Sequence, residues 1–159
     1  MQFLYQTVKE VLDSGRIGRP VFVRCLAQIA SDREYLKDAF AEVLATANAW
    51  LGASPQRVYA QGGEDAGYIT AAVHYLSGQT ALASMSAAKA NGPSRVDLML
   101  LGNKGAIYYD SLLLPSFVMP VRSISQSEQL SSSKMLMDAV ECSLRTGKSA
   151  IIEGGNGDE

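Results

Sequence analysis

Residues 8–25 of the chain, VKEVLDSGRIGRPVFVRC, contain the end of a helix, a glycine turn and the start of a strand. Apolar residues recur at three- and four-residue steps over residues 3–14, which predicts an amphipathic helix. Gly15 ends this helix, because a residue without Cβ accepts the left-handed conformation of a helix C-cap. The glycine and proline that follow prevent the helix from restarting, and the alternation from Val21 to Leu26 predicts a strand.

The rest of the chain predicts a long helix, a series of short strands and a final helix. Residues 32–51 contain neither glycine nor proline and have apolar residues at helical spacing, so we expect a helix that ends at Gly52. Ser131–Ser133 supply N-caps for the final helix. The remaining expected segments are a short strand at 56–61, a loop at 62–67, strands at 68–76 and 80–87 with a hairpin turn at 77–79, strands at 95–101 and 106–109 joined by 102–105, and the final helix from about 134 to 145.

This order of elements predicts an α+β fold with an open, mainly antiparallel sheet covered on one face by helices. Consecutive hairpins pair neighbouring strands in opposite directions, and an apolar sheet face requires helices over it. Apolar and small residues also occupy the other face, so we expect a partner sheet there, as in a homodimer. We expect residues 1–152 to form a single domain and the acidic, glycine-rich residues 153–159 to form a flexible tail.

The composition argues against several classes of partner and site. The chain has 159 residues, with 14 Lys and Arg against 16 Asp and Glu, a net charge of −2 that gives no general attraction to nucleic acid or to anionic membranes. No apolar run is long enough to cross a bilayer and no signal-peptide pattern is present, so we expect a cytoplasmic protein. Cys25 and Cys142 are expected to be buried thiols, and a single histidine predicts no metal site.

Five segments of the chain match a known pattern when their order and spacing are taken together. These segments are Gly15–Pro20 with the strand after it, Trp50-Leu51-Gly52 followed by Arg57–Ala60, the Ser77-Gly78 hairpin, Leu101–Ile107, and the end of the last helix at Arg145–Lys148. Over nearly its whole length the chain thereby resembles the C-terminal domain of the glucose-fructose oxidoreductase, inositol dehydrogenase and MocA (Gfo/Idh/MocA) family. The resemblance implies an open sheet that lines a substrate pocket and often builds dimers or tetramers, beside an N-terminal Rossmann domain that binds NAD(P).

The chain departs from this family at the residues that carry its chemistry. No Gly-x-Gly-x-x-Gly occurs, and the Glu-Lys-Pro element that follows the family's Rossmann domain is absent. The family's catalytic signature, an Asp, a His four residues later and an Asp three further on, aligns with Asp38, Glu42 and Ala45. Because only the first position is kept, neither a cofactor site nor a catalytic pair is carried over. Glu42 is then either a solvated carboxylate or an acid–base group.

Other polar residues are candidates for a ligand site, each with a structural alternative. His74, the only histidine, lies in a predicted strand, where it is either packed and hydrogen-bonded or placed to line a pocket. The candidate ligand-binding residues are Arg24, His74, Lys89, Arg95 and Tyr75, and Asp97 is a further polar residue expected to project from a strand. In a sugar-type pocket such groups would hydrogen-bond hydroxyls or pair with a carboxylate. The charged members have a solvated rim as their alternative. The tyrosines that would form an aromatic wall, or pack across strands, are Tyr68, Tyr75, Tyr108 and Tyr109.

Three hypotheses for function remain. The first is a Rossmann-less relative of the family's substrate domain, without dehydrogenase activity, that binds a small polar ligand, dimerises through its sheet or docks on a partner with a cofactor domain. The second is a fragment of a complete NAD(P)-dependent oxidoreductase of the sugar type. The third is an enzyme with new chemistry that uses His74 or Glu42 as its acid–base group, with Asp38 as a further candidate.

Overall fold

A computed structural model of the chain describes residues 2–29, 35–88, 94–112 and 129–152. Three helices and seven strands make up these residues, in the order helix, strand, helix, five strands, helix and strand. They are α1 (Gln2–Asp13), β1 (Pro20–Ile29), α2 (Leu36–Leu51), β2 (Pro55–Gly63), β3 (Tyr68–Tyr75), β4 (Thr80–Ala87), β5 (Arg95–Gly102), β6 (Ala106–Asp110), α3 (Gln129–Thr146) and β7 (Ala150–Ile151). The α+β class predicted from the sequence is confirmed.

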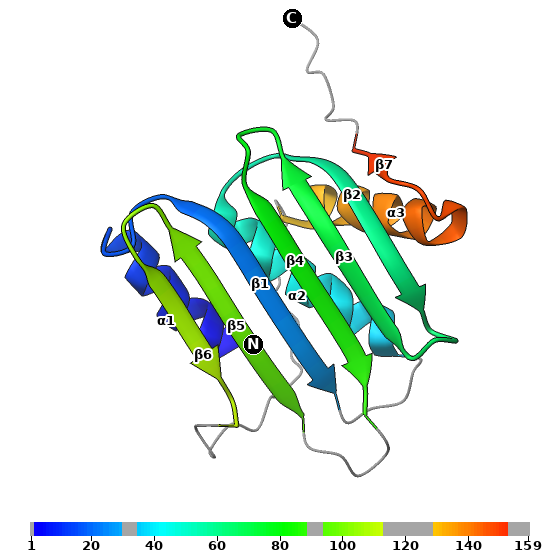
Figure 1. Cartoon of the computed structure of the whole chain (residues 1–159), viewed down its shortest axis with the longest axis horizontal. Helices are drawn as coiled ribbons and strands as arrows, with labels where there is room; N and C mark the ends of the chain where they lie inside the picture. The colour runs from blue at the N-terminus through cyan, green and yellow to red at the C-terminus, as the bar shows by residue number, and fades with distance from the viewer. Residues whose placement is uncertain (1, 30–34, 89–93, 113–128, 153–159) are drawn as a thin grey trace, which may run out of the picture.

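All seven strands belong to one twisted sheet in the order β6-β5-β1-β4-β3-β2-β7 (Figure 1). The β2/β3, β3/β4, β5/β6, β1/β5 and β2/β7 pairs are antiparallel, as the predicted hairpins require. The β1/β4 pair is parallel and lies in the middle of the sheet. Strand β1 therefore separates β4 from β5, although those two strands follow each other in the chain.

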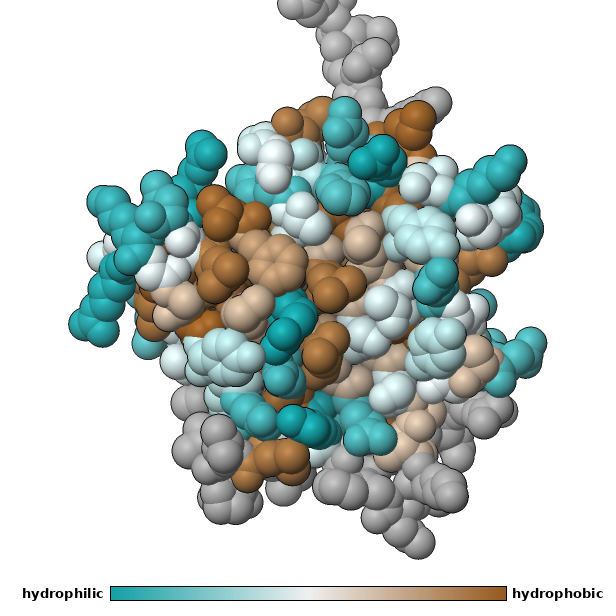
Figure 2. Space-filling view, in the orientation of Figure 1, coloured by the Kyte–Doolittle hydropathy of each residue, from teal (hydrophilic) through white to brown (hydrophobic). Residues whose placement is uncertain are grey.

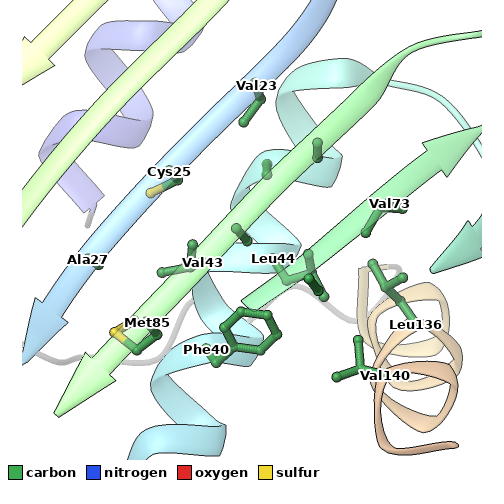
Figure 3. Close-up of a cluster of buried hydrophobic side chains, with 14 of the residues drawn as sticks. Val23, Cys25, Ala27, Phe40, Val43, Leu44, Val73, Met85, Leu136 and Val140 are labelled. Carbon is green, nitrogen blue, oxygen red and sulfur yellow. The ribbon is translucent and has the colours of Figure 1, made fainter. Parts of the chain in front are cut away.

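The helices lie on one face of this sheet, and the other face has no helix over it in the described part of the chain (Figure 1). Phe40 and Leu44 of α2 are buried against Met85 of β4, and Leu136 and Val140 of α3 complete this side of the core (Figure 3). Every second residue of β1 points into the same core, because side chains alternate along a strand. The sheet thus has one packed face and one open face.

The turn before β1 and the turn between β5 and β6 are locked together. The backbone N–H of Lys104 donates to the carbonyl of Ile17 at 3.0 Å, and the N–H of Asn103 donates to the carbonyl of Arg19 at 3.1 Å. In return, the Asn103 side-chain oxygen accepts the N–H of Arg19 at 3.0 Å. A Cβ at Gly102 would clash with the carbonyl oxygen of Ile17. Two glycine-rich motifs far apart in the sequence therefore form one structural unit.

Several details differ from the sequence-based expectations. β2 extends through Gly63, beyond the predicted end at residue 61, because β3 supplies partners up to its first residue. α3 begins at Gln129, so Ser131–Ser133 lie inside the helix and do not cap it. β7 was not predicted, since two residues carry no periodicity and only the pairing with β2 makes them a strand. The predicted tail at 153–159 lies outside the described residues.

The two cysteines have different environments. Cys25 is buried in the sheet core, and desolvation raises the pKa of its thiol to about 12. Cys142 on α3 is only half-buried, which corrects the expectation that both thiols are buried. Within the described residues, no helix combines the length and the apolar character needed to cross a membrane.

Candidate functional site

Three of the predicted ligand-binding residues, Arg24, His74 and Arg95, lie on the open face of the sheet. Its side chains come from alternate positions of six strands, and the strand registers place them in rows across the sheet. We define the open face as Phe22, Arg24, Leu26 and Gln28 of β1, Arg57, Tyr59 and Gln61 of β2, Tyr68, Thr70, Ala72 and His74 of β3, Thr80, Leu82, Ser84 and Ser86 of β4, Arg95, Asp97, Met99 and Leu101 of β5, and Ala106, Tyr108 and Asp110 of β6. Apolar and polar side chains are mixed on it (Figure 2).

A cluster of three polar side chains extends over the open face from the edge strand β6 across β5 to β1. Nη2 of Arg24 donates to Oδ1 of Asp97 at 2.8 Å and to the hydroxyl of Tyr108 at 3.0 Å. The guanidinium also lies 6.0 Å from the centroid of the Tyr108 ring, within the range of a cation–π contact. These hydrogen bonds raise the pKa of Arg24, so the side chain stays charged. We call Arg24, Asp97 and Tyr108 the central cluster.

The central cluster is more shielded from water than an ordinary surface ion pair. The side chains of Arg24 and Asp97 are 26% and 18% exposed. Across the strands, Arg24 lies between Met99 of β5 and Leu82 of β4. Nε of Arg24 is buried and has no hydrogen-bond partner among the described residues. The cluster therefore has unused donor capacity within an apolar surround.

The other predicted ligand-binding residues do not converge on the central cluster. Arg95 forms its own ion pair with Asp110, with Nη2 at 3.2 Å from Oδ2, at one end of the face. His74 lies on β3, opposite Arg57 and Thr80 and two strands away from β1. Lys89 lies outside the described residues. The five candidates thus form no single pocket in the described structure.

Tyr75 lies on the packed face, which corrects its assignment to a ligand site on the open face. Its side chain is 2% exposed, and its hydroxyl has no hydrogen-bond partner in the part of the chain described. Burial raises the pKa of this hydroxyl. Because strand residues alternate between faces, Tyr75 and its neighbour His74 cannot line the same surface.

His74 and the remaining tyrosines also differ from their expected surroundings. His74 is exposed, so the interpretation as a packed, hydrogen-bonded core residue is wrong. Tyr68 and Tyr108 share the open face but lie on β3 and β6, separated by three strands, and Tyr109 points to the packed face. No aromatic wall of four tyrosines forms. The sheet order separates Tyr68 from Tyr108, and strand alternation puts Tyr75 and Tyr109 on the packed face.

The residues aligned with the family's catalytic signature lie on α2. Asp38 and Glu42 are both exposed and are one helical turn apart on the outer side of that helix. Glu42 therefore lies on the helix side of the sheet and His74 on the open face. The two acid–base candidates of the third hypothesis cannot belong to one site.

A cleft that the sequence did not indicate lies between α2, the β2–β3 turn and α3. It has a volume of about 540 Å³, and four of its lining residues are acidic, namely Glu64, Asp65, Asp138 and Glu141. Nζ of Lys37 lies 3.8 Å from a carboxylate oxygen of both Glu64 and Glu141. Across the described ranges no group of three or more His, Cys, Asp or Glu side chains is arranged to hold a metal ion. The cleft is thus a partly neutralised acidic surface.

The described residues do not fit the phosphate cradle that NAD(P) requires. Such a cradle places a glycine turn before the N-terminus of a helix. The left-handed glycines adjoining helices, Gly15, Gly52 and Gly147, all follow C-terminal ends. α2 begins after Tyr35 without a side-chain cap and has Asp38 in its first turn, where a carboxylate repels phosphate.

Comparison with known proteins identifies the fold. No protein-family model and no curated protein matches the sequence. Among solved structures, a probable dehydrogenase from Thermotoga maritima matches with a TM-score of 0.72 at 15% identity, over 93% of this chain and 61% of that chain. Scyllo-inositol dehydrogenase from Lactobacillus casei, with bound NAD(H) and scyllo-inositol, matches with a TM-score of 0.68 at 15% identity, over 93% and 61%. Myo-inositol 2-dehydrogenase from Lactobacillus plantarum matches with a TM-score of 0.62 at 16% identity, over 94% and 61%.

These matches confirm, at the level of the fold, the resemblance to the C-terminal domain of Gfo/Idh/MocA dehydrogenases. The chain spans about three fifths of the length of the dehydrogenases that it matches. At identities below one fifth, the common property is the architecture of sheet and helices.

Proposed function

We propose that this chain, which folds as a dehydrogenase substrate domain, is an assembly module that pairs with a second copy through the open face and does not transfer hydride. The observation that carries the proposal is a broad sheet whose described helices all lie on one face. Large apolar side chains remain exposed on the other face, and these are Leu26, Tyr59, Tyr68 and Tyr108. They lie on four different strands, so a partner that covered the whole face would bury all of them.

The size of the open face agrees with such a contact. Six long strands at a spacing of about 4.8 Å and about eight residues at about 3.3 Å each give a face of roughly 750 Å². Stable protein interfaces bury about 800 Å² on each partner. Two open faces stacked as in a β-sandwich would therefore bury enough surface for a stable dimer.

Sedimentation equilibrium tests the dimer. We expect a mass of twice 17.0 kDa for the wild-type chain. Phe22→Arg places a charge on the open face between Leu101 and Thr80 and should weaken dimerisation by about 30-fold or more, as loss of an interface hot spot does.

Met135→Arg is the matched control for the Phe22 variant. Met135 is an exposed apolar residue on α3, on the helix side of the molecule, so its replacement should leave the dimer intact. A monomeric wild-type chain, or equal loss of the dimer in both variants, would contradict pairing through the open face.

A second candidate function is part of a complete NAD(P)-dependent oxidoreductase. It is favoured by the coverage of only about 61% of the dehydrogenases matched. The inositol dehydrogenases among them suggest a polyol as the substrate class of such an enzyme. The gene upstream of Met1 tests this function: an in-frame strand–glycine turn–helix segment supports it, and a stop codon directly upstream contradicts it.

A cytoplasmic location is a further part of the proposal. Cys25 and Cys142 are both free thiols. Free thiols are typical of the reducing cytosol, whereas secreted domains of this size frequently have disulfides. Fractionation of cells that express a tagged chain would check the location, and recovery of the chain in the medium would contradict it.

A further inference from the structure

Arg24 is the member of the central cluster that lies at the middle of the open face, while Asp97 lies one strand away on β5 and Tyr108 lies on the edge strand β6. Leaving out the short β7, six strands make up the sheet, and β1 and β4 are the two middle ones. Along β1, which runs from Pro20 to Ile29, Arg24 is one of the two middle residues and the one that points to the open face. Two equal faces overlap most when the two-fold axis passes through their centres, so Arg24 would lie close to that axis.

Residues near a two-fold axis meet their own copies. An unpaired arginine at this place would face a second arginine across the axis, and the two charges would repel each other. Asp97, whose Oδ1 lies 2.8 Å from Nη2 of Arg24, cancels that charge within each copy. With both signs present, each arginine can also approach the carboxylate of the other copy.

The cluster also has hydrogen-bonding capacity that its own chain does not use. Arg24 donates through Nη2 to both Asp97 and Tyr108, and a guanidinium has five N–H groups. The hydroxyl of Tyr108 accepts from Arg24, which leaves its proton for another acceptor. Leu26, directly opposite Asp97, belongs to the apolar surround that would exclude water when the faces close.

We infer that the central cluster meets its own copy across the two-fold axis, so that Arg24 and Asp97 of one chain pair with Asp97 and Arg24 of the other and fix how the two sheets stack. This inference rests on the proposed sheet-face dimer. It adds the identity of the residues that hold the register of that dimer.

Charge complementation between two variants tests the inference. Arg24→Asp leaves two acidic groups at the centre of the face, and Asp97→Arg leaves two basic groups. Each variant alone should dimerise about 100-fold more weakly than the wild type, because like charges meet across the axis. An equimolar mixture of the two should form a 1:1 heterodimer, which native mass spectrometry detects by its intermediate mass.

Arg57 provides the control. It is an exposed charge of the same open face, on β2, three strands from β1 in the sheet order. Arg57→Asp should keep a dimerisation constant within about threefold of the wild type, as for a rim charge. Mixed with the wild type, this variant should form homodimers and heterodimers without preference.

The outcomes separate this inference from the proposed function. A wild-type dimer that Phe22→Arg disrupts, with no heterodimer from the two central variants, would overturn the inference and leave the sheet-face dimer standing. A monomeric wild type would overturn both. If circular dichroism shows that either central variant is unfolded, Arg24→Gln and Asp97→Asn replace them. Each should then weaken the dimer at least about tenfold, and an unchanged constant would contradict the inference.

Discussion

At the scale of single residues, two buried hydroxyl groups show how differently the same chemical group is held. Oγ of Ser143 accepts the backbone N–H of Ala60 at 2.9 Å and donates to the carbonyl of Lys148 at 2.7 Å. It thereby ties α3 to β2 and to the turn before β7. The hydroxyl of Tyr75 is equally buried, but no described residue lies within hydrogen-bond reach of it. A buried polar group without a partner costs folding free energy.

Replacing these two hydroxyls should have opposite consequences. Tyr75→Phe should leave the free energy of unfolding unchanged or raise it by up to about 1 kcal/mol, whereas Ser143→Ala should lower it by about 1–3 kcal/mol. Urea denaturation of both variants measures the difference. A loss of more than about 1 kcal/mol in Tyr75→Phe would show that this hydroxyl has a partner that the described residues do not reveal.

Strand alternation also separates two of the predicted site residues at this scale. His74 and Tyr75 are adjacent in a strand, and side chains in a strand alternate between faces. The alternation alone excludes a ligand site on one face that contains both. Whether His74 would be packed was a different question, since it depends on what covers its face, and the answer came only from the position of the helices.

At the scale of elements, the locked pair of turns explains why the two glycine-rich motifs occur together. The turn before β1 contributes the carbonyls of Ile17 and Arg19, and the β5–β6 turn contributes backbone N–H groups and the side chain of Asn103. The contact fixes the start of β1 against the end of β5. These two strands form the antiparallel half of the sheet that carries the central cluster.

Two alanine substitutions in the β5–β6 turn test this packing. A Cβ at Gly102 would clash with the carbonyl oxygen of Ile17, so Gly102→Ala should lower the free energy of unfolding by about 3 kcal/mol or more. A Cβ at Gly105 would lie 3.4 Å from Cγ2 of Ile17, an ordinary contact, so Gly105→Ala should cost less than about 1 kcal/mol. Thermal denaturation followed by circular dichroism compares them. Equal stability of the two variants would contradict the interlock.

At the scale of the whole molecule, the described strands form a sheet with one parallel pair in its centre, and the described helices all lie on one side of it. A dinucleotide-binding sheet instead has parallel strands with helices on both faces and a glycine turn at a helix N-terminus. The described residues therefore have the architecture of the C-terminal domain of these dehydrogenases, which differs from that of a dinucleotide-binding sheet.

We accordingly expect no saturable binding of NADPH to this chain. A titration followed by nicotinamide fluorescence should give a linear response, while an intact inositol dehydrogenase in the same buffer should saturate. Saturable binding would contradict the cofactor-free assembly module.

The sequence by itself determined the α+β class, the places of the three helices and the hairpin-linked strand pairs, because these depend on local periodicity and on glycine turns. It also identified Arg24 and Asp97 as polar residues that project from strands. Only the tertiary structure decided that β1 lies between β4 and β5. This order brings Arg24 and Asp97 together on the open face, while Tyr75 and Glu42 lie on the helix side of the sheet. The reason is physical: sheet order is set by contacts between segments distant in the chain, and no local pattern specifies them.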